Sequence, residues 1–94
     1  MASELRKSFS KQGRRIREIR ELARLGRVEF ARRIGVSPPQ IIRYEKGWDR
    51  PGRATTLNIC REFNVNEKWL TGGEAPIYKN TASTRGKFVI TERI

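Results

Sequence analysis

The sequence predicts an all-α fold, a five-helix bundle followed by a short strand-like tail. Apolar residues recur at three- and four-residue spacing in five successive segments, which is the periodicity of amphipathic helices. Glycine, proline and asparagine stand between these segments, where helices begin and end. Only Phe88-Val89-Ile90, near the C-terminus, has the composition of a strand. With 36% hydrophobic residues in 94, the chain can build one compact core.

The first twelve residues, which are polar and basic, predict an N-terminal arm over residues 1–12. Leu5 and Phe9 are a pair of large apolar side chains at helical spacing, and such a pair alone predicts no more than a loose turn. We expect the folded domain to begin after this arm and to cover residues 13–70.

The first helix is expected from Gly13 to near Gly26. Its stripe of apolar residues, spaced by three or four, comprises Ile16, Ile19, Leu22 and Ala23. The opposite face is rich in arginine, and we expect it to be an ordinary solvated face, with phosphate contact as the alternative. The arginines concerned are Arg14, Arg17, Arg20 and Arg24.

A second, shorter helix is expected from about Arg27 to Ile34, with Gly26 as its N-cap. Phe30, Ala31 and Ile34 share one face of it. Gly35 accepts a left-handed backbone without steric cost, so that three residues suffice to reverse the chain.

The third helix starts with a strong signal, Ser37-Pro38-Pro39-Gln40. A serine cap, a proline at the first helical position and a glutamine three residues after the cap fit a helix N-terminus. The helix should run to about Lys46, because Gly47 stops it.

Two further helices complete the expected bundle. Thr56, Ile59, Cys60 and Phe63 define a fourth helix, which follows a turn over residues 48–52. A short fifth helix is capped by Asn66 and carries Trp69 and Leu70. Residues 71–94 form a C-terminal tail that is mostly loop.

Composition excludes several classes of function. The chain has no histidine and one cysteine, so the ligand sets of zinc sites and the histidine-based triads cannot be assembled. No glycine motif that cradles phosphates follows a plausible strand. We therefore expect a protein that is not an enzyme and holds no metal and no cofactor. Cys60 fits a small core residue.

The charge of the chain indicates a polyanionic partner. Twenty-one Lys and Arg stand against ten Asp and Glu, a formal net charge of +11, and nucleic acid is the leading candidate. No apolar run approaches the roughly 18 residues of a membrane span, and the residues from Met1 to Lys7 lack the apolar stretch of a secretory signal. We expect a cytoplasmic, nucleoid-associated protein without membrane contact.

Two short helices joined by a three-residue turn are the arrangement of a helix-turn-helix. In this motif the second helix lies in the major groove of DNA with its N-terminal end against the base edges. Here that end carries Pro39, Gln40 and, one turn on, Arg43. Glutamine can pair with adenine, and arginine with guanine or a phosphate.

Four stretches carry a family resemblance: Gly13-Arg-Arg-Ile-Arg-Glu-Ile-Arg, Phe30-Ala-Arg-Arg-Ile-Gly-Val-Ser, Ile41-Ile-Arg-Tyr-Glu-Lys-Gly and Phe63-Asn-Val-Asn-Glu-Lys-Trp-Leu. In this order and register, they resemble the Cro and lambda-repressor type of helix-turn-helix domain, called Xre-like. The resemblance covers about Gly13 to Leu70. It implies a lambda-repressor-like bundle of five helices that binds operator DNA, usually as a dimer.

Departures from the family pattern fall on the expected DNA face. Gly26-Arg27 stands where the family commonly has Thr-Gln, so Arg27 would replace the glutamine as a phosphate ligand. Ile42 stands where the family often has Ser or Thr, and it either meets a thymine methyl group or is a semi-exposed residue. Arg53 replaces a residue that is usually apolar, which puts one core contact in doubt.

The candidate DNA-contact residues each have a structural alternative. Gln40 reads a base or only closes a capping box with Ser37. Arg43 should face outward, because Ile41 and Tyr44 should face the core. Trp48 packs under the following loop or lies on the sugar-phosphate backbone. The full set is Arg27, Ser37, Pro39, Gln40, Ile42, Arg43, Lys46, Trp48 and Arg50.

The function that follows is a sequence-specific regulator of transcription that binds double-stranded DNA. The stretch from Trp69 to Tyr78 looks like that of small phage and mobile-element regulators, which favours a prophage-type repressor acting as a homodimer on a pseudo-palindromic operator. The alternative is an antitoxin that neutralises a toxin protein and represses its own operon. A strand over Lys87–Thr91 could form the dimer contact, or pair within one chain with Ile77-Tyr78.

Overall fold

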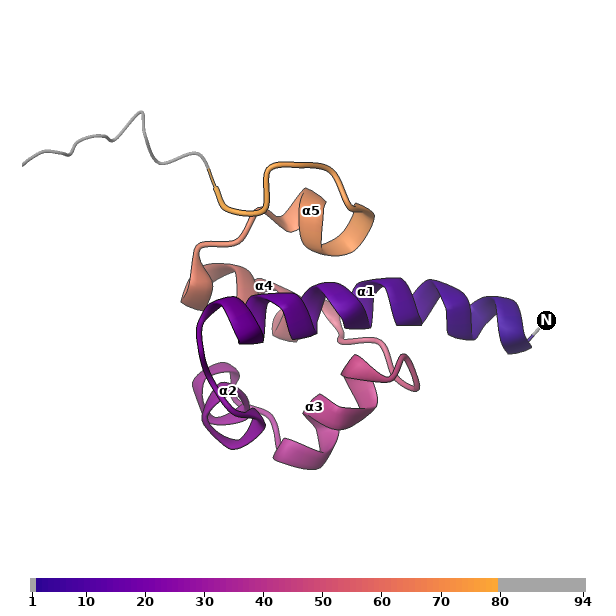
Figure 1. The fold of residues 1–94 in the computed structure, drawn as a ribbon, viewed down its shortest axis with the longest axis horizontal. Coiled ribbons are helices and arrows are strands. Elements are labelled where there is room, and N and C mark those ends of the chain that lie inside the picture. Colours follow the sequence, from indigo (N-terminus) through magenta and orange to yellow (C-terminus); the bar gives the residue numbers. More distant parts are fainter. Residues whose placement is uncertain (1, 80–94) are drawn as a thin grey trace, which may run out of the picture.

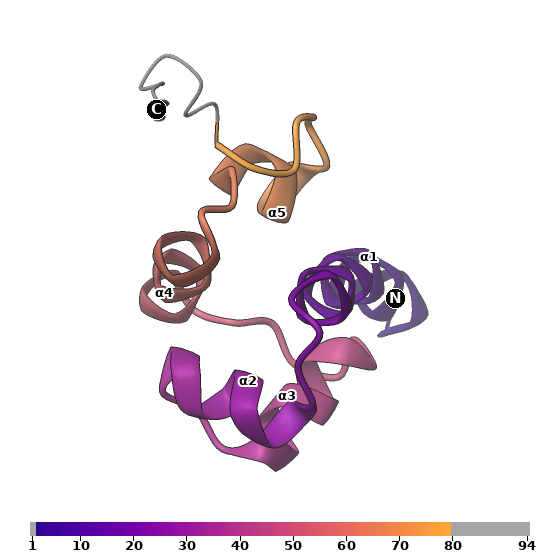
Figure 2. The same ribbon diagram turned by 60° about the vertical axis from the view of Figure 1, so that its left-hand side comes forward.

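The computed structural model describes the backbone of residues 2–79 and the side chains from Ser10 onward. It contains, in that range, the helices α1 (Ala2–Leu22), α2 (Arg27–Ile34), α3 (Pro38–Glu45), α4 (Arg53–Phe63) and α5 (Glu67–Gly72). The all-α fold expected from the sequence is confirmed. Figures 1 and 2 show α1 and α4 between α5 on one side and the α2–α3 pair on the other.

The first helix begins earlier and ends earlier than the sequence pattern indicated. Residues 2–12 form the first half of α1, and the loose turn expected there is wrong. This segment has no glycine or proline and is rich in strong helix formers. The helix continues through Gly13, which lies against α3 at a place where a Cβ would overlap the carbonyl oxygen of Tyr44. The helix ends at Leu22, and Arg24 then takes a left-handed backbone with φ of 60°.

The turn between α2 and α3 is built as expected. Gly35 is left-handed with φ of 80°, and its N–H donates to the carbonyl of Ala31 at 2.9 Å. The N–H of Val36 donates to the same carbonyl at 3.0 Å, so the last turn of α2 is closed. Ser37 caps α3, its hydroxyl accepting from the N–H of Gln40 at 3.4 Å. The side chain of Gln40 does not complete the box, because it donates elsewhere.

The core lies where all five helices meet. Its fully buried members come from α1 to α4, from α5 and from the link before α5: Ile16, Ile19, Phe30, Ile34, Ile41, Ile59, Val65 and Leu70. Phe63 stacks on Phe30 with ring centroids 5.1 Å apart. Cys60 is a buried core residue, and this burial raises the pKa of its thiol.

The folded domain extends past Leu70, the residue at which we expected it to end. The N–H of Asn66 donates to the carbonyl of Ile77 at 2.8 Å, and the N–H of Lys79 donates to that of Asn64 at 2.9 Å. Tyr78 thereby forms an antiparallel bridge with Val65, so Ile77-Tyr78 already has a partner in its own chain. The expected strand over residues 87–91 lies outside the described residues.

Helices α4 and α5 are joined at their surface by an ion pair. Helix α4 starts at Arg53, three residues before the apolar pattern begins. The side chain of Arg53 points to solvent, and its Nη1 donates to Glu67 at 2.8 Å. Arg53 therefore makes an ion pair at the surface in place of the core contact that an apolar residue would make at this position. Asn66 caps α5 as expected.

The described residues carry neither a membrane-spanning helix nor a cluster of metal ligands. Over residues 2–79, every helix is too short or too polar to cross a bilayer. The same part of the chain holds no group of three or more acidic, cysteine or histidine side chains placed to bind a metal ion.

Candidate nucleic-acid interface

Helix α3 presents one face to the core and the other to solvent. Ile41 and Tyr44 are buried, which turns Ile42 and Arg43 outward, as expected from the helical period. The serine cap and the prolines at its first turn set the start of the helix. The exposed face of α3 is therefore a short, rigid platform for polar side chains.

The two side chains expected to read bases meet at a residue that the sequence analysis did not single out. Nε2 of Gln40 donates to Oδ2 of Asp49 at 2.9 Å. Nε of Arg43 donates to the same oxygen at 2.7 Å, and Nη2 of Arg43 donates to Oδ1 at 3.3 Å. A single acid between Lys46 and Arg50, just after the third helix, was the available sequence signal for this residue.

The turn after α3 brings Asp49 into position through its backbone. The N–H groups of Trp48 and Asp49 both donate to the carbonyl of Arg43, at 2.9 and 3.3 Å. Gly47 makes this turn possible with φ of 78°, a conformation that suits glycine. It also lies against Ser10 of α1, where a Cβ would meet the Ser10 backbone at 2.8 Å. The first half of α1 therefore supports the turn.

Trp48 stands beside the same cluster and is 51% exposed, so about half of its surface is open to solvent and its contact with the sugar-phosphate backbone stays a prediction. Two cations lie over its ring. Nζ of Lys46 is 5.0 Å from the ring centroid, and Cζ of Arg43 is 5.9 Å from it. Cation–π contacts of this length are attractive and hold the long basic side chains near the ring.

The hydrogen bonds also shift the titration of the cluster. The bond from Arg43, and then that from Gln40, hold the pKa of the Asp49 carboxyl below its usual value. The bond to Asp49 raises the pKa of Arg43. Both groups are therefore charged throughout the neutral range.

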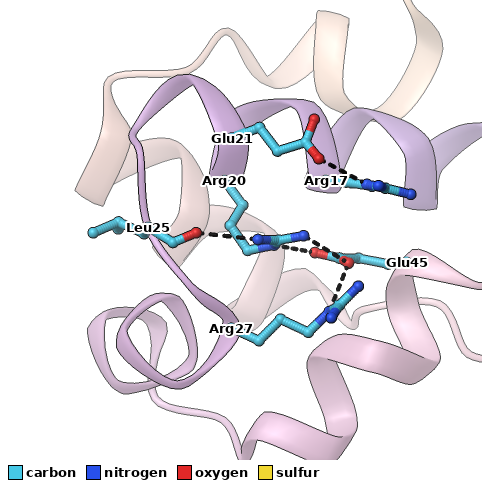
Figure 3. A network of polar contacts seen from close by, with 6 residues as sticks. All are labelled: Arg17, Arg20, Glu21, Leu25, Arg27 and Glu45. Carbon is cyan, nitrogen blue, oxygen red and sulfur yellow. Dashed lines mark hydrogen bonds and ion pairs between the residues drawn. The ribbon is translucent and has the colours of Figure 1, made fainter.

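A second polar network ties α1, α2 and α3 together at Glu45 (Figure 3). Nε of Arg20 donates to Oε2 of Glu45 at 2.6 Å, and its Nη2 donates to Oε1 at 3.3 Å. Nη1 of Arg20 donates to the carbonyl of Leu25 at 3.1 Å. The Glu45 side chain is 3% exposed and that of Arg20 is 11% exposed. Arg20 is therefore a buried structural residue, and its assignment to a solvated face is wrong.

Arg27 joins this network from the surface. Its Nε donates to Oε1 of Glu45 at 3.0 Å, and its side chain is 43% exposed. Two guanidinium groups share one carboxylate here, so one positive charge is left over at the N-terminus of α2. That end of a helix also favours an anion. The expected phosphate contact of Arg27 is compatible with this geometry and stays a prediction.

Five of the candidates lie at the surface on or beside α3. Ser37 and Pro39 are exposed at the start of α3, Ile42 is exposed on it, and Lys46 and Arg50 are exposed in the following turn. The contacts described above connect Gln40, Arg43, Lys46 and Trp48 through Asp49 and the indole ring. Arg27 is linked to α3 separately, through Glu45.

Residues 13–76 match a family model described as a helix-turn-helix domain. The match runs from the middle of α1 to the segment after α5 and includes all the candidate residues. Searches of the curated proteins and of the solved structures returned no match.

Proposed function

The chain belongs to the Xre-like helix-turn-helix family of DNA-binding domains, and from this premise we propose that it is a sequence-specific regulator of transcription. Its ligand is double-stranded DNA, and α3 enters the major groove. We expect it to act in the cytoplasm at the nucleoid, where that ligand is.

The observation that carries the proposal is the outward face of α3. Gln40 and Arg43 lie one turn apart and meet at one carboxylate, so their polar groups point to a common region. Glutamine offers a donor and an acceptor that match the major-groove edge of adenine, and arginine offers a donor pair that matches guanine. Ile42 between them can contact a thymine methyl group.

Basic residues around this face supply the contacts to the DNA backbone. Arg27 lies at the start of α2, and Lys46 and Arg50 lie in the turn after α3. With a formal net charge of +11, the chain is attracted to any duplex, and release of counterions makes this part of the affinity fall with salt. Trp48 lies among these cations and can pack on a sugar. These groups orient α3, while the residues on α3 select the sequence.

We further propose that the protein is a prophage-type repressor that binds as a two-fold dimer. A dimer of this kind reads two half-sites about one helical turn apart, so its operator is pseudo-palindromic. The family resemblance supports this arrangement. Exposed Tyr78, paired with Val65 at the edge of the domain, and residues 87–91, for which the sequence composition predicts a strand, are the segments of this chain suited to a dimer contact.

Selection from a randomised duplex pool tests the proposal. At about 0.15 M salt, the full chain should enrich an inverted repeat. The enriched duplex should bind on the order of a thousandfold tighter than a scrambled duplex of equal length. A chain that binds all duplexes equally, with affinity set only by salt, would be a nonspecific DNA-binding protein, and the proposed function would be wrong.

A further inference from the structure

We propose that Asp49 is a positioning residue that sets sequence specificity by fixing the two base-reading side chains of α3 before DNA arrives. This inference rests on the proposed function, because it concerns how the same surface selects its sequence. It assigns a role in DNA recognition to an acidic residue on a surface whose partner is a polyanion.

The carboxylate of Asp49 holds both base-reading side chains, Gln40 and Arg43. Oδ2 of Asp49 accepts from Nε2 of Gln40 at 2.9 Å and from Nε of Arg43 at 2.7 Å, and Oδ1 accepts from Nη2 of Arg43 at 3.3 Å. The side chains of Arg43 and Asp49 are 49% and 37% exposed, so the hold depends on the paired geometry and the shared acceptor rather than on burial. Gln40 and Arg43 are both long side chains with many rotamers, and the shared carboxylate restricts them together.

The hydrogen bonds to Asp49 leave the base-reading atoms of Gln40 and Arg43 available. Arginine has five N–H donors, and Asp49 takes the side edge formed by Nε and Nη2. The end-on pair of Nη1 and the second Nη2 hydrogen forms no hydrogen bond within the described residues, and this pair matches N7 and O6 of guanine. Gln40 uses one Nε2 hydrogen and keeps the other, together with Oε1, for adenine.

Asp49 is itself held in place by the turn after α3. The turn after α3 returns to the carbonyl of Arg43, which accepts from the N–H groups of Trp48 and Asp49 at 2.9 and 3.3 Å. The indole ring of Trp48 also contacts Arg43, with the ring centroid 5.9 Å from its Cζ. Arg43 thus contacts both a carboxylate and a ring, and Gly47 packs the turn closely against Ser10 of α1.

Asp49 affects the affinity for all DNA and the preference for one sequence in different ways. A negative charge on the DNA face repels phosphates of every sequence alike, so Asp49 weakens nonspecific binding. Restriction of Gln40 and Arg43 helps only those duplexes that present the matching base edges, because less side-chain entropy is lost when the readers are ordered on DNA. The repulsion leaves the ratio between selected and scrambled DNA unchanged, and the restriction of Gln40 and Arg43 raises it.

The test compares Asp49→Asn with Glu62→Gln in the full chain. Both substitutions turn an exposed acid into its amide and remove one negative charge, but Glu62 lies on α4 and pairs with Arg33 at 3.8 Å, away from the readers. The probes are the duplex enriched by the unchanged chain and a scrambled duplex. We expect Asp49→Asn to bind the scrambled duplex more tightly and to lower the selected-to-scrambled ratio by about 5-fold to 100-fold. Glu62→Gln should leave the ratio unchanged.

Two outcomes would overturn the inference. If Asp49→Asn tightens binding to both duplexes equally, Asp49 is only a repulsive charge. If it tightens binding to the selected duplex more, the carboxylate is an inhibitory latch that DNA must displace.

A measurement without DNA keeps the inference separate from the proposed function. In the DNA-free chain, the Nε–H resonance of Arg43 should exchange slowly with water and lose this protection in Asp49→Asn. If the unchanged chain enriches no duplex, the proposed function fails while this readout still tests the hold on Arg43. An Arg43 resonance that exchanges as fast as those of exposed arginines in the unchanged chain would overturn the positioning role.

Discussion

Removal of the Glu45 carboxylate should destabilise the domain more than removal of any exposed acid, and Glu45→Ala is the perturbation that shows it. Glu45 accepts from Arg20 through two bonds of 2.6 and 3.3 Å and from Arg27 through one of 3.0 Å. Without the carboxylate, the guanidinium of Arg20 stays buried with the carbonyl of Leu25 as its remaining acceptor.

The size of the effect follows from this burial. Removing one partner of a buried ion pair costs about 3–5 kcal/mol, since an uncompensated charge is left behind. Arg20 keeps one acceptor and Arg27 can turn to solvent, so the lower end applies, and we expect a loss of about 3 kcal/mol in the free energy of unfolding. For a domain of this size, that loss lowers Tm by about 12–24 °C.

Urea unfolding followed by circular dichroism measures this loss, with the m-value expected to stay unchanged. Glu21→Ala is the matched control, because Glu21 pairs with Arg17 at 2.9 Å while both side chains are more than half exposed. It should cost no more than about 0.5 kcal/mol. A cost below about 1 kcal/mol for Glu45→Ala would refute the view that this ion pair is a buried one that holds α1 on α3.

Two further predictions concern the packing of the domain. Gly13→Ala should destabilise it by about 1–3 kcal/mol despite the better helix propensity of alanine, because the new Cβ meets the carbonyl of Tyr44. Gly72→Ala is the control, since a Cβ at Gly72 lies in open space, and it should be neutral or slightly stabilising. Equal thermal stabilities of the two variants would contradict this prediction. The Cys60 thiol, whose pKa is raised by burial, should react with Ellman's reagent only as the domain unfolds in urea, and a rapid reaction of the native chain would contradict its burial.

Local signals predicted the motif itself. Gly35, Ser37 and Asn66 act on residues within a few positions of themselves, through a left-handed backbone or a cap, so their roles are legible in the sequence. The boundaries of α2 were predicted for this reason.

Contacts between distant elements were not predictable in this way. Arg20 is 25 residues from Glu45, and its burial depends on how α1 crosses α3. The early start of α1 could not be inferred from the spacing of Leu5 and Phe9 alone. Asp49 is six residues from Arg43, and only the return of the turn after α3 makes them neighbours. Sequence reasoning proposed Gln40 and Arg43 as base readers, which stays a prediction, and missed Asp49, which accepts hydrogen bonds from both.

The most direct test of sequence reading by α3 is to compare Arg43→Ala with Arg27→Ala on the selected and the scrambled duplex over a range of salt concentrations. A residue that reads a base should cost about 1–3 kcal/mol on the selected duplex and relax the preference at one base pair of each half-site. A phosphate ligand should weaken binding to both duplexes alike and reduce the salt slope by about one. We expect the first result for Arg43→Ala and the second for Arg27→Ala. Equal losses on both duplexes for both variants would contradict the claim that α3 reads the sequence.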